Sequence, residues 1–114
     1  MSQTKRQYRG FEDSLRERLA DAEYARVFLD VALEKYEKDG DTEAFLLALR
    51  DVTEAQGGIG RLAERTNLNR QNLYKALSEK GSPRLETVRA ILHGLGFRLS
   101  VEPVKTEELV KVSE

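Results

Sequence analysis

Cysteine is absent from this sequence of 114 residues, and its absence excludes disulfide bonds and thiolate metal sites. No run of apolar residues approaches the roughly 20 that are needed to span a bilayer. The first six residues are followed by no apolar stretch, so they do not have the pattern of a secretory signal. We therefore expect an intracellular, cytoplasmic protein of one domain's length.

The side chains that most enzymes and metal sites use are also scarce. His93 is the single histidine, and a lone histidine lacks both the further ligands of a metal site and a paired nucleophile. The sequence contains no phosphate-binding loop of the P-loop type, and no pattern pairs its many carboxylates in a cleft. We expect neither an enzyme nor a bound metal or cofactor, and we interpret His93 as a helix-end residue.

Charges of both signs are present but unevenly distributed. The formal net charge is -1 at pH 7. Residues 57–98 nevertheless contain eight Lys or Arg and three Asp or Glu, a net charge of +5, whereas residues 21–56 contain four basic and ten acidic residues. A local excess of basic residues favours contact with a polyanion, although charged side chains also simply solvate helices. The motif within the basic segment has to decide between these two interpretations.

Apolar residues in the first half of the chain recur every three or four positions, which is the spacing of a helical face. Asp21 is a suitable N-cap, and Gly40 followed by Asp41 suits the end of one helix and the start of the next. The pair Gly57-Gly58 ends the pattern. We predict three helices here, with inward-facing residues Phe11, Leu15 and Leu19, then Tyr24, Val27, Phe28 and Val31, then Phe45, Leu46, Leu49 and Val52.

Shorter helices are predicted in the second half of the chain. The segments Ile59 to Thr66 and Arg70 to Ser78 each have apolar residues on one side, and a turn joins them. After a loop, Ser82 suits an N-cap and Pro83 suits the first position of a last helix, which Gly94 helps to close. The predicted inner face of this last helix consists of Leu85, Val88, Ile91, Leu92 and Leu95.

The pattern changes after the last helix. Phe97 to Glu102 alternates between apolar and polar residues, which is the period of a β-strand, and Pro103 ends the alternation. A single strand leaves backbone groups unpaired, so we expect it to pair with a strand of a second copy or of another protein. Residues 104–114 have weak periodicity, and we expect a frayed or flexible tail.

The two short helices form a helix-turn-helix in this interpretation. Leu62, Leu68 and Leu73 would meet under the turn and set the angle between the helices. Asn67 stands where the chain must reverse in a left-handed conformation, which asparagine tolerates better than most residues. Asn69 is then a natural N-cap of the second helix.

The second helix of such a motif presents its N-terminal residues to the base edges of DNA. With Leu73 and Leu77 facing inward, the polar side chains at positions 70, 71, 72 and 75 face outward. In the major groove arginine pairs with guanine, and glutamine or asparagine pairs with adenine. The unpaired N–H groups of the first turn at Gly58 suit a phosphate. The predicted DNA-binding residues are Asn69, Arg70, Gln71, Asn72, Tyr74, Lys75, Lys80, Ser82 and Arg84.

The segment Gly58 to Leu99, GIGRLAERTNLNRQNLYKALSEKGSPRLETVRAILHGLGFRL, resembles the lambda-repressor-like (Xre-type) helix-turn-helix family. Similarity to addiction-module antitoxins, the HigA-like antidote partners of small RelE/HigB-like toxins, extends from about Tyr8 to Pro103 and includes Ala44 to Val52. The resemblance implies a lambda-repressor-like all-α bundle of five to six helices, to which the alternation adds one short C-terminal β-strand. It also implies a homodimer that binds a palindromic operator, and a small toxin as a partner.

Three functions remain open at this point. We favour a sequence-specific DNA-binding antitoxin of a type II toxin-antitoxin module that represses its own operon. The alternatives are a plain helix-turn-helix transcriptional regulator without a toxin, and an interaction module with a degenerate motif. The predicted organisation is an N-terminal helical extension at 1–40, the DNA-binding domain at 41–103 and a flexible tail at 104–114.

Two surfaces also have two interpretations each. The acidic residues of 21–54 suit either a solvated face, which we favour, or contact with a basic toxin. The stripe of Tyr24, Phe28 and Val31 suits either the core, which we favour, or an interface. The dimer interface could consist of the last helix with its strand, or of the two N-terminal helices.

Overall fold

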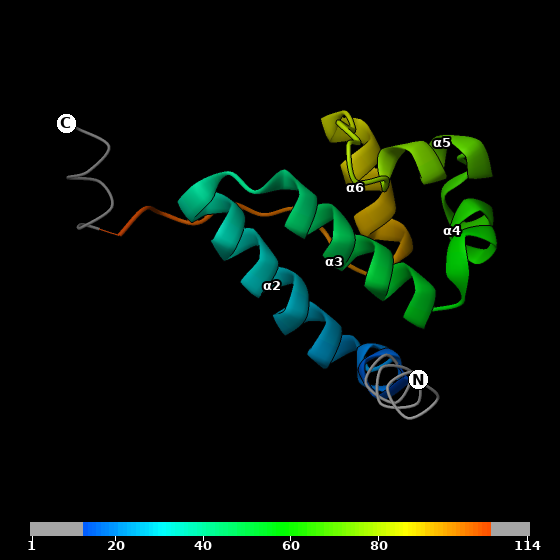
Figure 1. Ribbon diagram of the computed structural model, residues 1–114, viewed down its shortest axis with the longest axis horizontal. Coiled ribbons are helices and arrows are strands. Elements are labelled where there is room, and N and C mark those ends of the chain that lie inside the picture. Colours follow the sequence, from blue (N-terminus) through cyan, green and yellow to red (C-terminus); the bar gives the residue numbers. More distant parts are fainter. Residues whose placement is uncertain (1–12, 106–114) are drawn as a thin grey trace, which may run out of the picture.

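The computed structural model describes residues 13–105, and this part of the chain is built from helices (Figure 1). Phe11 and the part of the predicted tail from residue 106 onward lie outside the described residues. None of the described helices is long and apolar enough to cross a bilayer. After the helical residues 13–19, the elements are α2 (Ala22–Asp39), α3 (Thr42–Ala55), α4 (Gly58–Thr66), α5 (Arg70–Ala76) and α6 (Leu85–Gly94).

Side chains cap the starts of α2 and α3 as the sequence predicted. Asp21 and Asp41 each accept, through a carboxylate oxygen, the backbone N–H three residues ahead, at 2.9 and 3.0 Å. Gly40 closes α2 in the left-handed region, with a φ of 69°. These groups satisfy backbone donors and acceptors that helix ends leave unpaired, and they set the tight connection between the two helices.

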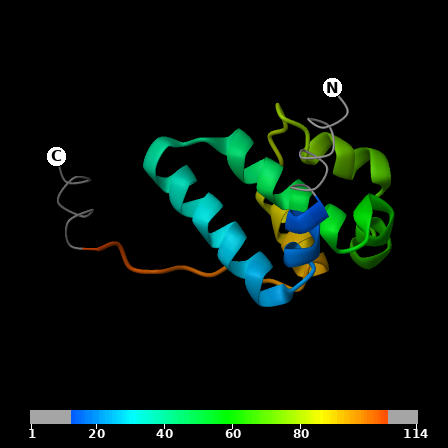
Figure 2. The same cartoon turned by 60° about the horizontal axis from the view of Figure 1, so that its bottom comes forward.

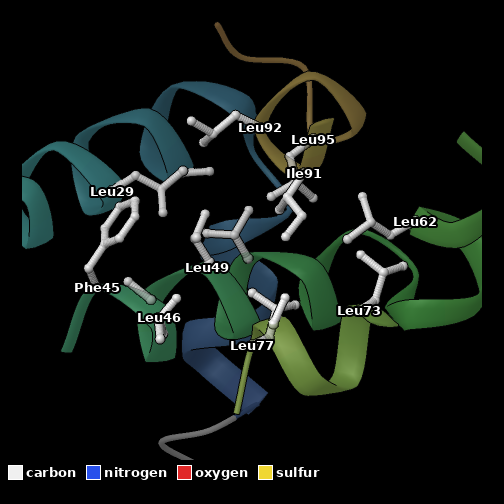
Figure 3. Close-up of a cluster of buried hydrophobic side chains, with 14 of the residues drawn as sticks. Leu29, Phe45, Leu46, Leu49, Leu62, Leu73, Leu77, Ile91, Leu92 and Leu95 are labelled. Atoms are coloured by element: carbon white, nitrogen blue, oxygen red, sulfur yellow. The ribbon is translucent and has the colours of Figure 1, made fainter. Parts of the chain in front are cut away.

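The core lies where α3 meets the other helices. In Figure 3, Leu49 of α3 stands between Leu29 of α2, Leu77 at the end of α5, and the side chains of α6. Burying a side chain of this size contributes about 1.5–3 kcal/mol, so packing rather than helix propensity stabilises the short α4 and α5. The labelled core residues are Leu29, Phe45, Leu46, Leu49, Leu62, Leu73, Leu77, Ile91, Leu92 and Leu95.

Helix α4 packs against three other helices, α3, α5 and α6. It meets α6 at Gly94. A Cβ atom built on Gly94 would lie 2.6 Å from Cδ1 of Leu62 and 2.8 Å from Cγ2 of Thr66. Arg65 of α4 adds a hydrogen bond from Nη1 to the Gly94 carbonyl oxygen at 3.2 Å. Glycine at position 94 therefore leaves the space that Leu62 and Thr66 occupy, in addition to closing the helix as predicted.

Helix α2 is rotated about its axis relative to the prediction. Ala25 and Leu29 are the buried residues of α2, and α2 packs against α3. Apolar residues cover two adjoining faces of α2, and periodicity alone does not choose between them. Of the four residues that the sequence predicted to face inward, only Phe28 is even half-buried, so the prediction was wrong for the other three. The others are Tyr24, Val27 and Val31, with exposed fractions of 39%, 47% and 58%.

The ends of α5 and α6 also differ from the prediction. Helix α5 stops at Ala76, and the Ser78 hydroxyl donates to a backbone carbonyl at 2.9 Å, a local bond that competes with helix continuation. Helix α6 begins after Arg84, whose carbonyl accepts the first helical N–H bonds. Ser82 and Pro83 thus lie in the loop rather than in the first turn, and Leu85 is exposed rather than inward-facing.

The predicted strand at Phe97–Glu102 was wrong. Residues 97–105 form neither helix nor strand, and the segment leaves the bundle beside α2 (Figure 2). The Phe97 N–H donates to the Leu92 carbonyl at 2.8 Å, which ties the start of the segment to α6. A strand needs a neighbour to pair with, and residues 13–105 contain no other strand. The alternating pattern therefore indicated a local preference for a β-strand, but it could not show whether a partner strand is present.

We predict that Leu29→Ala lowers the free energy of unfolding by about 2–5 kcal/mol, because truncation of this buried side chain leaves a cavity. Val27→Ala on the exposed side of α2 is the matched control, and its effect should stay below about 1 kcal/mol. Urea denaturation followed by circular dichroism measures both values. The reverse ranking would show that α2 packs through the other face.

Candidate nucleic-acid interface

Residues 67–69 connect α4 to α5 and set the angle between them. Asn67 has a φ of 62° and is the one non-glycine residue of the described range with a positive φ, as the sequence predicted. Leu62 and Leu73 are fully or almost fully buried, and Leu68 packs half-buried against the same cluster. The turn is thus closed by the three leucines that the sequence placed under it.

Helix α5 begins with a side-chain cap. Oδ1 of Asn69 accepts the backbone N–H of Asn72 at 2.7 Å, which confirms the predicted N-cap. Leu73 and Ala76 are the buried residues of the helix. The Asn69 oxygen is occupied by this bond, so the first role of Asn69 is to start α5 with the orientation that the turn gives it.

The outer side of α5 carries the polar residues that the sequence singled out. Arg70, Gln71, Asn72 and Lys75 are exposed, and their side chains make no hydrogen bond or ion pair with any residue of 13–105. Tyr74 is 62% exposed and does not cover the core. The structure therefore gathers hydrogen-bond donors and acceptors on one short helix, where they can exchange water for a ligand.

The other predicted residues lie past the C-terminal end of α5. Lys80, Ser82 and Arg84 are exposed in the loop between α5 and α6. Nη1 of Arg84 lies 3.8 Å from the Glu86 carboxylate, an exposed pair of the kind that contributes little to stability. The predicted residues thus form two groups, one along α5 and one in the loop that follows it.

Arg50 of α3 fixes the C-terminal end of α5 and was not among the residues singled out from the sequence. Its Nε and Nη2 atoms donate to the Leu77 carbonyl at 3.1 and 2.8 Å. Leu77 is the C-cap of α5, where carbonyls lack helical partners and a guanidinium forms strong bonds with them. The signal available in the sequence was a lone basic residue of α3 directly after the buried Leu49.

Helix α2, the first part of the acidic segment, lies on the side of the bundle away from α5 (Figure 1). Figures 1 and 2 both show α3 and α6 between α2 and α5. On α2, a hydrogen bond from Arg26 to Glu23, at 2.6 Å, reinforced by the Arg26 charge, lowers the pKa of the Glu23 carboxyl. The same contact raises the pKa of Arg26. Helix α2 is thus away from α5 (Figure 1), whereas α3, the other helix of the acidic segment, packs against α4.

His93 is exposed in the last turn of α6, the helix-end position that the sequence predicted. It borders a groove of about 550 Å³ between α4 and α6, together with Arg65 and Arg89. Among residues 13–105, no group of three or more His, Cys, Asp or Glu side chains is placed to hold a metal ion. The candidate site in the described part of the chain is instead the outer side of α5, whose exposed polar side chains have no partner within residues 13–105.

These features define a small helical protein with a helix-turn-helix arrangement and an unpaired polar surface on its second helix. Residues 11–103 match the family described as "Probable addiction module antidote protein", and the chain belongs to this family. An uncharacterized protein of Haemophilus influenzae is 29% identical over 86 residues, which cover 75% of this chain and 84% of that protein. No solved structure matches the chain. The resemblance to antitoxins seen in the sequence is confirmed at the level of the family.

We predict that Arg50→Met lowers the free energy of unfolding by about 1–3 kcal/mol, because it removes two hydrogen bonds and leaves the Leu77 carbonyl without them. Arg18→Met is the matched control, since Arg18 is exposed on residues 13–19, and its effect should stay within about 0.5 kcal/mol. Urea denaturation compares the two variants. Equal effects would show that the bond to Leu77 does not fix α5.

Proposed function

We propose that this protein is a sequence-specific DNA-binding antitoxin of a type II toxin-antitoxin module, of the Xre-type, HigA-like class. In this role it acts in the cytoplasm, represses its own operon as a homodimer and neutralises a small RelE/HigB-like toxin. The observation that carries the DNA-binding part is the outer side of α5, with its exposed and unpaired Arg70, Gln71, Asn72 and Lys75. Membership in an antidote family carries the toxin-binding part.

DNA binding would place α5 in the major groove. Gln71 and Asn72 have the amide groups that pair with adenine N6 and N7, and Lys75 is a cation suited to phosphate or guanine. Lys80, Ser82 and Arg84 in the following loop would contact the sugar-phosphate backbone and hold the register. Two copies would insert their α5 helices about 34 Å apart on one face of the duplex and so block the promoter.

Helix α2 offers the surface that we propose for the toxin. Tyr24, Val27 and Val31 form an exposed apolar stripe beside the half-buried Phe28. The segment 21–56 that surrounds it holds ten acidic and four basic residues, which favours a basic partner and disfavours a second copy of the same acidic surface. Because α3 and α6 lie between α2 and α5, one molecule could hold toxin and DNA together (Figure 1).

Fluorescence anisotropy with the duplex from upstream of the gene and with a scrambled duplex, at two salt concentrations, tests DNA binding. We expect preference for the upstream duplex and weaker binding at high salt. Gln71→Ala should cost about 1–3 kcal/mol on the upstream duplex and reduce the preference for it, whereas Ser100→Ala, in the segment after α6, should leave binding unchanged. Equal, weak binding to both duplexes would indicate a general polyanion surface, and no binding would indicate an interaction module.

Co-purification with the small protein encoded beside the gene tests the toxin surface. Val27→Lys places a cation in the stripe and should abolish co-purification while DNA binding persists, because α2 lies away from α5. Leu33→Lys makes the same charge change on a different side of α2 and is the control. Loss with both variants, or with neither, would contradict the proposed surface. If no neighbouring protein binds the wild type, the plain transcriptional regulator is the better description.

A further inference from the structure

Gly60, in the first turn of α4, and Arg70, the first residue of α5, are in contact. A Cβ atom built on Gly60 would lie 2.9 Å from Nη2 and 3.3 Å from Cζ of Arg70. The guanidinium therefore occupies the space that a side chain at position 60 would need. Gly60 is not among the glycines with positive φ, so its backbone conformation is open to any residue. Space for Arg70, rather than backbone freedom, is what glycine provides here.

The position of Arg70 at the start of α5 explains why its side chain points toward α4. In an α-helix the Cα–Cβ bond tilts toward the N-terminus, so the first residue of α5 directs its side chain back over the turn toward α4. Gln71, Asn72 and Lys75 start one or more residues later along α5 and stay on its outer surface. The Arg70 guanidinium makes no hydrogen bond or ion pair within residues 13–105, so its N–H donors are available to a ligand.

We propose that Gly60 is a positioning residue that holds Arg70 as a contact to the DNA backbone rather than to a base. The inference rests on the proposed DNA binding. In a helix-turn-helix the first helix crosses the sugar-phosphate backbone while the second enters the groove. A guanidinium drawn back against the first turn of α4 lies on the backbone side of the motif. Base reading is then left to Gln71 and Asn72, and Arg70 does not take the guanine-reading role expected from the sequence.

Gly60→Ala separates this role from a structural one. Alanine is favoured over glycine in a helix, and the atoms in the way belong to the far end of a flexible side chain, so the fold has room to adjust. We expect an unchanged or higher melting temperature. Affinity should nevertheless fall about tenfold for every duplex, and the slope of log affinity against log salt should fall by about one. A merely structural role would move melting temperature and affinity in the same direction.

A double-mutant cycle with wild type, Gly60→Ala, Arg70→Ala and the double variant tests the inference. Each protein is titrated with the upstream duplex and a scrambled duplex of equal length, between about 50 and 200 mM salt. We expect Arg70→Ala to weaken both duplexes by a similar factor, and Gly60→Ala to add nothing once Arg70 is gone. Gln71→Ala is the contrast, since it should weaken the upstream duplex alone.

Three outcomes would overturn the inference, and they are distinguishable. If Arg70→Ala weakens the upstream duplex alone, Arg70 reads a base and DNA binding itself stands. If Gly60→Ala costs the same with and without Arg70, Gly60 does not act through Arg70. If the wild type shows no salt-dependent binding to either duplex, the proposed DNA binding fails, and the inference fails with it.

Discussion

The packing of α4 against three helices is the constraint on which the other features depend. α4 touches α3, α5 and α6, and its contact with α6 exists because Gly94 has no side chain to separate Leu62 and Thr66 from the α6 backbone. A Cβ atom at position 94 would force Leu62 and Thr66 to shift, and protein interiors have few voids to absorb the extra volume. α5 contacts α4 and is separated from it by only three residues, so a displaced α4 would displace the polar surface as well.

Two anchors convert that packing into a fixed orientation of α5. The turn at Asn67 and the cap at Asn69 hold the N-terminal end, and the bonds from Arg50 to Leu77 hold the C-terminal end. A helix of seven residues is only about 10 Å long and would not be stable alone. So short a helix spans about three base pairs, which is why the proposed repressor needs two copies to recognise an operator.

The uneven charge along the sequence favours different helices for the two proposed partners. The basic segment contains α4, α5 and α6, and the acidic segment contains α2 and α3. A polyanion is attracted to the first and repelled by the second, whereas a basic protein has the opposite preference. The net charge of -1 conceals this arrangement, because the two segments nearly cancel. Toxin and DNA would then interact through linkage between sites rather than by competing for one surface.

The sequence by itself determined the local features. Short-range chemistry explains them, because a capping side chain bonds to the backbone a few residues away and a helical face repeats every turn. The features of this kind are the caps at Asp21, Asp41 and Asn69, the left-handed Asn67 and the exposed side of α5. Most of the candidate site belongs to this class, because its residues are neighbours on one helix. The family was also recognisable from its motifs.

Only the tertiary structure decided what depends on distant neighbours. Periodicity allowed two faces of α2, and packing in the folded bundle buried the face with Ala25 and Leu29. Alternation at Phe97–Glu102 needed a partner strand that residues 13–105 do not supply. The bonds from Arg50 to Leu77 join positions 27 residues apart, and the contact between Gly60 and Arg70 joins two different helices. Such contacts arise from the folded arrangement of whole helices, and a pattern confined to one segment holds no information about them.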